Sequence, residues 1–269
     1  YEMLGPISAV LRLLPPLEKF DSEIGDIFSL GRIHVTLGYS LEQNLKWDEA
    51  LEKLQKGLKI SEELDDVENV IYAHFVLGRL NWCIGNFDKA IEHFKDGIKI
   101  VEERRGKEKW RASSHYQTLS DTYRVKGDLD KAEDMCRKAL EYSEMADNPV
   151  LTSYVLVHYV LTCLEKGDVE KAKELLERGL KLAQEVRNAG GIIVNFYGLG
   201  YLYAVKREYE RSIEYLEEAK KLSDESGSYK TFAVMAEIIK ASSYLHVGDL
   251  ENAFQCLATS FELAPPPFK

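Results

Sequence analysis

The sequence lacks long hydrophobic runs and an excess of basic residues, and each absence excludes a class of protein. Its longest apolar stretches, such as Tyr154 to Cys163, are interrupted and shorter than the ~20 residues that cross a bilayer. Lys and Arg number 35 against 45 Asp and Glu, which gives a net charge of -10. Because a phosphate-binding surface needs clustered Lys and Arg, we expect neither nucleic acid nor a membrane as a partner.

Paired cysteines and internal prolines are also missing. The four cysteines, Cys83, Cys136, Cys163 and Cys256, are far apart and form no C-x-x-C pair. We expect them to be buried, reduced thiols of a cytoplasmic protein rather than a disulfide framework. No secretory signal pattern is visible. Proline is confined to the two ends and Pro149, so helices between them can run unbroken.

Catalytic motifs are absent as well. The sequence contains no G-x-x-x-x-G-K-[ST], H-E-x-x-H or G-x-S-x-G. The Gly198-x-Gly200 pair lacks the third glycine of a dinucleotide motif and lies within a predicted helix. The six histidines are scattered, and none is spaced from Cys or Asp like a metal ligand, so we predict no metal and no cofactor. We therefore predict a binding protein and not an enzyme.

What the sequence does contain is a repeat of about 40 residues. A five-residue phrase recurs. It begins with a polar residue and continues with an apolar residue, an acidic residue, any residue and a small residue. The small residues that close the six copies are Ala50, Ala90, Ala132, Ala172, Ser212 and Ala253. Such regular self-similarity is typical of solenoid proteins, in which each unit packs only against its neighbours.

Each copy of the phrase reads as a turn between two helices. Gly85, Gly127, Gly167 and Gly248 stand just before it, and glycine readily adopts the positive φ that ends a helix. The Asp or Asn that follows each of these glycines can cap the next helix. Apolar residues recur at helical spacing on both sides of the phrase, and no strand-like alternation persists. The fold class is therefore all-α.

These residues resemble the tetratricopeptide repeat (TPR). That family places Leu-Gly in its first helix, as in Leu37-Gly38, Leu77-Gly78 and Leu199-Gly200, and a small residue at the start of its second helix. The resemblance implies an α-α superhelix of antiparallel helix pairs, in which small residues let the helices approach closely. The standard repeat has about 34 residues. The longer repeats here are similar to those of Pins/LGN-type adaptors and of the sensor domains of MalT-like signal-transduction ATPases.

The repeat spacing also predicts the organisation of the chain. Residues 1–20 are expected to be the second helix of a preceding repeat, bent or stopped by Pro15-Pro16. Residues 21–265 form six repeats in one superhelical domain, and residues 266–269 a tail. The charged run from Glu102 to Lys109 is expected to be a solvated loop between repeats. An incomplete first repeat would expose an apolar face, so self-association is possible.

The resemblance implies that a partner binds the concave face formed by the first helices. The family's groove positions are the second, fifth, ninth and twelfth residues of each first helix. In this sequence they are Arg32, Val35, Tyr39, Glu42; Tyr72, Phe75, Arg79, Trp82; Ser114, Gln117, Asp121, Arg124; Tyr154, Val157, Leu161, Leu164; Val194, Tyr197, Tyr201, Ala204; Met235, Ile238, Ser242 and Leu245. The candidate binding residues among them are Arg32, Tyr39, Tyr72, Phe75, Arg79, Trp82, Arg124, Tyr154, Tyr197 and Tyr201.

This set is rich in Tyr, Trp, Phe and Arg, the residue types that dominate binding hot spots. It predicts an apolar groove with a few positive points, suited to a peptide or amphipathic helix of a partner protein. The alternative is that some of these aromatic side chains pack between neighbouring helices. Trp47 is expected in the core, Trp82 on the groove, and Trp110 at its edge.

Two functions follow from these observations. The first is a protein–protein interaction scaffold in cytoplasmic signalling that holds a peptide or helix of its partner. The second is the small-ligand or protein sensor domain of a MalT-like regulator, which would place a P-loop before Tyr1 in the complete gene.

Overall fold

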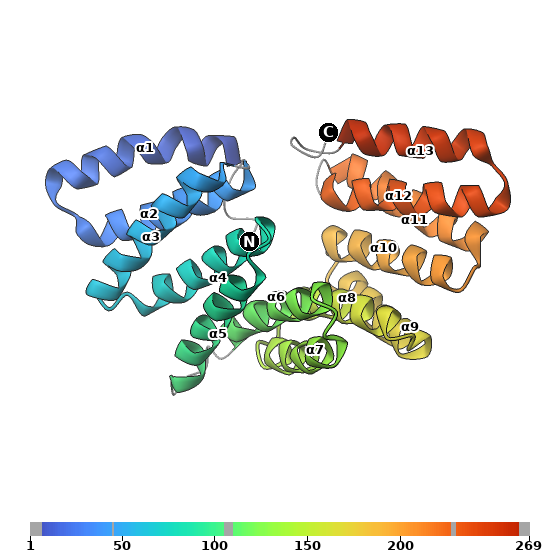
Figure 1. Cartoon of the computed structure of the whole chain (residues 1–269), viewed down its shortest axis with the longest axis horizontal. Helices are drawn as coiled ribbons and strands as arrows, with labels where there is room; N and C mark the ends of the chain where they lie inside the picture. Colours follow the sequence, from blue (N-terminus) through green and yellow to red (C-terminus); the bar gives the residue numbers. More distant parts are fainter. Residues whose placement is uncertain (1–6, 45, 105–109, 227–229, 264–269) are drawn as a thin grey trace. The chain divides into compact units, whose positions relative to one another are not determined.

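The computed structural model describes residues 7–44, 46–104, 110–226 and 230–263, and it shows thirteen α-helices over those residues (Figure 1). Each repeat consists of two antiparallel helices joined by a short turn. Their bounds are α1 Ile7–Ile24, α2 Ile27–Gln43, α3 Trp47–Glu63, α4 Val67–Cys83, α5 Phe87–Glu103, α6 Ala112–Val125, α7 Leu129–Glu144, α8 Pro149–Glu165, α9 Val169–Glu185, α10 Ala189–Val205, α11 Tyr209–Ser226, α12 Lys230–Val247 and α13 Leu250–Leu263. The predicted all-α fold of TPR-type helix pairs is confirmed. In repeats 1, 2, 4 and 5 most helices have 17 residues, which accounts for the 40-residue period.

The helices form two compact units, Tyr1–Asp128 (unit 1) and Leu129–Lys269 (unit 2). Within each unit, a helix packs against the next helix along the chain. Consecutive first helices also contact one another, as α2 does α4 and α8 does α10. Among the described residues, the backbones of consecutive second helices do not approach each other in this way, and long side chains such as Lys171 of α9 and Glu133 of α7 reach across instead. In each unit the row of helices therefore closes more tightly on its first-helix side, as on the concave side of a solenoid.

Small residues set the close crossing of the two helices in a repeat. The openers Ala50, Ala90, Ala132 and Ala172 are completely buried. A Cβ at Gly38 would lie 2.5 Å from Cγ of Leu54, so the side chain of the second helix occupies the space that the glycine leaves open. Phe94 fills the same space beside Gly78, and Leu216 fills it beside Gly200. The packing predicted from the repeat pattern is therefore present in both units.

The turns inside the repeats follow the glycine pattern. Gly85, Gly127, Gly167 and Gly248 have φ values of 81°, 80°, 80° and 84°. The fifth repeat has Arg207 at this place, and its φ is 62°. The caps are less uniform. The side chains of Asp168 and Asp249 accept hydrogen bonds from the backbone N–H of Lys171 and Asn252, whereas that of Asn86 makes no capping bond.

Each unit has its own apolar core. In unit 1, the core between α2, α3 and α4 is built on residues such as Val35, Leu54 and Leu77. In unit 2, a larger cluster between α7 and α10 includes Leu156, Leu176 and Leu202. Trp47 is half-buried and packs against the unit 1 core, as predicted.

Two local predictions are wrong. The stop predicted at Pro15 and Pro16 is absent: helix α1 continues through both prolines to Ile24, because each proline removes only its own N–H donor while α1 remains packed against α2. Cys83 is an exposed residue rather than a buried one, since it is the last residue of α4; the other three cysteines are buried, and none of the four forms a disulfide.

Some predicted features are outside the described residues. They are most of the charged run from Glu102 to Lys109 and the tail at residues 266–269. Over the part of the chain that the structure describes, no helix is both long enough and apolar enough to span a bilayer.

Candidate functional site

The groove positions lie on the first helices, and we call the surface they form in each unit its first-helix face. In unit 1 this face belongs to α2, α4 and α6, and in unit 2 to α8, α10 and α12. Each face is described separately. The two first-helix faces have different side chains, although both are formed by the first helices of consecutive helix pairs.

In unit 1 the structure brings together four of the predicted residues, which we call the Arg79 cluster: Tyr39 on α2, and Tyr72, Phe75 and Arg79 on α4. All four are half-buried. The rings of Tyr39 and Tyr72 are 6.3 Å apart. The guanidinium carbon of Arg79 lies 5.4 Å from the centre of the Tyr39 ring and 5.9 Å from that of Phe75. Such stacking fixes the rings and the charge in one arrangement.

The charge of Arg79 is compensated within the chain. Its guanidinium donates to both carboxylate oxygens of Glu42, at 3.2 and 3.4 Å. Glu42 is buried, with a side chain only 3% exposed. Burial acts to lower the pKa of Arg79, but the Glu42 carboxylate and the hydroxyl group of Tyr39 raise it by more, so the pKa of Arg79 is raised overall and Arg79 stays charged. Partial burial of the Cys83 thiol, which lies 3.6 Å from the same carboxylate, and the charge of that carboxylate raise the pKa of Cys83 to about 11, so the thiol is a weak nucleophile.

The other two predicted arginines are also beside acids. Arg32 donates two hydrogen bonds to Asp66, at 2.7 and 3.0 Å, and these bonds lower the pKa of Asp66. Arg124 lies 3.6 Å from Asp121. Each arginine that supplies a predicted positive point of the groove therefore has an acidic partner in its own unit.

The tryptophans take three different places. Trp82 is half-buried on α4, and its indole N–H is buried with no hydrogen-bond partner among the described residues. Trp110 is half-buried just before α6, with the Arg111 guanidinium 5.2 Å from its ring centre. Trp47 belongs to the core edge described above.

In unit 2 the first-helix face is apolar. Tyr154 on α8 and Tyr201 on α10 are half-buried against the unit 2 core. Tyr197 is only 3% exposed and packs with Leu216 and Ala236, so for this residue the alternative of packing between helices holds. On α12 the corresponding residues Met235, Ile238 and Leu245 are 43%, 50% and 50% exposed.

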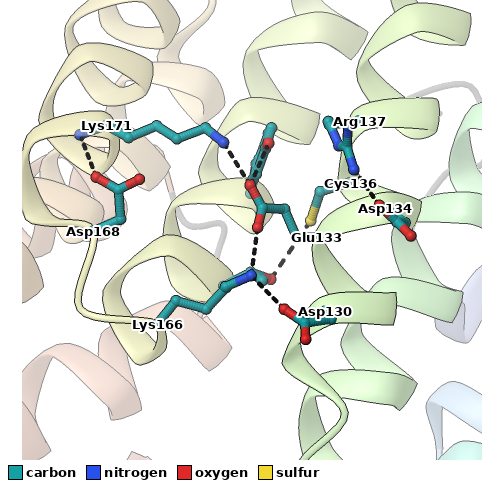
Figure 2. Close-up of polar contacts among 10 residues, drawn as sticks. Asp130, Glu133, Asp134, Cys136, Arg137, Lys166, Asp168 and Lys171 are labelled. Carbon is teal, nitrogen blue, oxygen red and sulfur yellow. Dashed lines mark hydrogen bonds and ion pairs between the residues drawn. The ribbon is translucent and has the colours of Figure 1, made fainter.

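A charge network of unit 2 joins α7 to the end of α8 and to α9 (Figure 2). Glu133 on α7 accepts hydrogen bonds from Lys166 and Lys171, both at 2.6 Å. Lys166 also donates to Asp130 at 2.7 Å. These bonds lower the pKa of Glu133 to about 2. The network joins repeat 3 to repeat 4, and both of its lysines are bonded to carboxylates of the chain itself.

The sequence reasoning missed the acidic partners of the arginines. Glu42 and Arg79 were both assigned to the groove, but they were read as separate positions 37 residues apart. A separation of 37 residues is three residues shorter than the 40-residue repeat. It therefore places the twelfth residue of one first helix beside the ninth residue of the next first helix. That offset is the signal that could have revealed the pair.

Comparison with known proteins agrees with this architecture. The family described as the MalT-like TPR region matches residues 23–196, and the tetratricopeptide repeat family matches residues 195–226. No curated protein matches the sequence.

Several solved structures share the fold at low sequence identity. The apo quorum sensor NprR from B. thuringiensis is similar with a TM-score of 0.75 and 16% identity, over 94% of this chain and 70% of that one. A signal-transduction ATPase with a TPR sensor from Pyrococcus horikoshii gives 0.67 and 16%, over 96% of this chain and 40% of that one. A Rap protein complexed with competence and sporulation factor gives 0.65 and 15%, over 96% and 76%.

The helix pairs, their glycine turns and their small-residue crossings thus coincide with a family match over more than half of the sequence. The chain belongs to the family of MalT-like TPR regions.

Proposed function

We propose that this chain is a non-catalytic protein–protein interaction module and that it binds a peptide or helix of a partner protein on the first-helix face of unit 1. The observation that carries the proposal is the Arg79 cluster, in which three aromatic rings and a guanidinium form one half-buried surface across α2 and α4. Aromatic residues and arginine dominate binding hot spots, and a fixed arrangement lowers the entropy lost on binding.

The chemistry of the cluster defines the partner. Tyr39, Tyr72 and Phe75 offer apolar surface for aliphatic or aromatic anchor residues. A carboxylate on the partner would compete with Glu42 for Arg79, so charge contributes less than apolar contact. A segment with two or three apolar anchors spaced along an extended strand or one side of a helix fits these requirements best.

Selection of peptides from a random library on the immobilised chain, followed by solution binding, tests this proposal. We expect the selected peptides to carry apolar anchors and to lose at least about tenfold in affinity when Tyr72 is replaced by alanine, as at a hot spot worth more than 1.4 kcal/mol. The matched control is Lys59→Ala on the exposed side of α3.

Circular dichroism verifies that both variants are folded. Peptides that bind the folded Tyr72→Ala variant as tightly as the unchanged chain would contradict the proposal. Peptides that lose affinity to both variants equally would contradict it as well.

A second function, the sensor domain of a MalT-like regulator, is favoured by the family match over residues 23–196. NprR and the Pyrococcus ATPase are described as a quorum sensor and as carrying a TPR sensor. In this case the first-helix face would bind a small ligand or a protein signal and control an attached ATPase. The complete gene then encodes a nucleotide-binding P-loop module before Tyr1, and its sequence decides the question.

Cytoplasmic location, a role in signalling and self-association belong to the same proposal. Light scattering over a range of concentrations tests self-association. A mass that stays at 30.7 kDa at all concentrations would exclude it.

A further inference from the structure

Repeat 2 contains a cluster of three potential ligands that the sequence spacing did not predict. His74 on α4 and His93 on α5 bring their Nδ1 atoms to 3.2 Å. Asp96 lies one turn after His93 on α5. The ligand atoms of the three side chains are all within 4.8 Å of one another.

This geometry is suited to one small divalent cation. Two imidazole nitrogens that each bind Zn²⁺ at 2.0–2.1 Å in a tetrahedral site are about 3.3 Å apart. The two Nδ1 atoms are already at nearly this separation. His74 is buried, His93 is half-buried and Asp96 is exposed, so the cluster has a buried inner side and an open outer side. An ion can enter from solvent, and water can complete its coordination.

Comparison with the other repeats shows that packing does not require these polar groups. The two histidines are sixteen residues before and three residues after the small opener Ala90. Repeat 4 has Leu156 and Leu175 at these positions. Repeat 5 has Phe196 and Tyr215 at these positions, and their ring centres are 5.9 Å apart. The ring centres of His74 and His93 in repeat 2 are 5.4 Å apart. Apolar pairs therefore fill the same space.

The third position supports the same interpretation. Repeats 1, 3 and 4 have Lys56, Lys138 and Arg178 where repeat 2 has Asp96; repeat 5 has Glu218 there but lacks both histidines. Repeat 1 also has a buried histidine, His34, at the place of His74, but Lys53 and Lys56 occupy the other two positions. Basic groups there repel a cation, whereas repeat 2 provides a carboxylate.

We propose that His74, His93 and Asp96 form a binding site for a single Zn²⁺ ion, with water as the remaining ligand. The ion would join α4 to α5 within repeat 2. Mixed nitrogen and oxygen ligands with an open position are typical of zinc sites, whereas calcium and magnesium prefer oxygen alone.

Isothermal titration calorimetry of ZnCl₂ into the chelator-treated full chain tests this site. We expect saturable binding of one ion per chain. His93→Tyr, which reproduces the side chain of repeat 5, should keep the fold and lower the affinity at least about tenfold, and Asp96→Asn should lower it in the same direction. His246→Gln and Asp134→Asn, which change a histidine and an aspartate of unit 2, should leave the affinity unchanged.

Visible absorption spectroscopy provides a second measurement that is independent of the calorimetric signal. Co²⁺ bound to the unchanged chain should give the visible absorption of a four-coordinate ion with nitrogen ligands, and Asp96→Asn should alter that spectrum. Absence of saturable zinc binding would overturn the proposal. Binding of equal affinity to the folded His93→Tyr and Asp96→Asn variants would also overturn it, because the ion would then be bound elsewhere.

Discussion

The first-helix faces of the two units differ in kind although their helix pairs are built alike. In unit 1 the face combines aromatic rings with buried or half-buried ion pairs, of which Arg79 and Glu42 are the central example. In unit 2 the equivalent positions are Tyr201 and Leu164, and the face is apolar. One set of its ion pairs lies around Glu133 of α7, which is bonded to Lys166 at the end of α8 and to Lys171 of the second helix α9.

The difference separates two sets of constraints. The crossing of the helices needs a small residue opposite a large one, and both units satisfy this need in the same way. The first-helix face is not constrained by the crossing, so it can differ from unit to unit. The side chains that differ between the units are therefore the ones we assign to recognition.

Replacement of Arg79 by tyrosine, the residue that unit 2 has at the equivalent position 201, should have the largest effect on stability. Arg79→Tyr leaves the buried Glu42 carboxylate without its arginine, and breaking a buried pair in this way costs about 3 kcal/mol of unfolding free energy. The double variant Glu42→Leu with Arg79→Tyr reproduces Leu164 and Tyr201, and we expect it to be within about 1 kcal/mol of the unchanged chain. Urea denaturation of the single and double variants measures the coupling.

The reverse outcome would show that the ion pair is not coupled. If the double variant is as unstable as the sum of the two single variants, unit 1 does not tolerate the apolar pair of unit 2. The two faces would then be fixed by packing rather than left free for recognition.

The helix crossing provides the next test, since it should respond alike in both units. Gly78→Ala forces a Cβ against the Phe94 ring, and overpacking of this kind costs about 2 kcal/mol. Gly200→Ala meets the more flexible Leu216 and should cost about 1 kcal/mol. Thermal melts of both variants check the order. A stable Gly78→Ala variant would contradict the close approach of α4 and α5.

The Glu133 network should make unit 2 sensitive to acid. The folded-state pKa of Glu133 is about 2, below the ordinary glutamate value of 4.5, so its stabilisation is present above pH 4.5 and is lost as the pH falls toward 2. Because the lysines are partly exposed, we expect Glu133→Gln to cost roughly 1–2 kcal/mol at pH 7. The difference between the variant and the unchanged chain should disappear near pH 2. A difference that does not vary with pH would exclude the charge network as its cause.

The smallest effect is expected at the turn of repeat 5. Arg207 has φ 62° where four other repeats have glycine. Glycine removes the strain of a left-handed backbone but adds disorder to the unfolded chain, so Arg207→Gly should stabilise by at most about 1 kcal/mol. The matched change Gly167→Ala should destabilise by a similar amount. Denaturation midpoints that move in the opposite directions would contradict this account of the turns.

The fold could be predicted from the sequence because its determinants are local and repeated. The glycines before each phrase, the small openers and the Leu-Gly pairs lie within one repeat and recur in register, so each copy reinforces the others. The same pattern located the four residues of the Arg79 cluster on one face.

The charges of the site could not be predicted in the same way. Glu42 and Arg79 lie on different repeats, and Asp66, which accepts from Arg32, is the N-cap residue of α4 rather than a groove position. Whether His74 and His93 meet depends on how α4 crosses α5, which their spacing of 19 residues does not reveal. Tyr197 was placed on the groove because its position in the repeat is equivalent to Phe75, yet its ring is buried beneath α12 in the cluster with Ala236.

The most direct test of the central claim is a crystal structure of the chain with a selected peptide bound. We predict that the peptide lies along α2 and α4 and that its apolar side chains contact Tyr39, Tyr72 and Phe75. A peptide bound to the second helices of either unit, with the Arg79 cluster still exposed to solvent, would contradict the account.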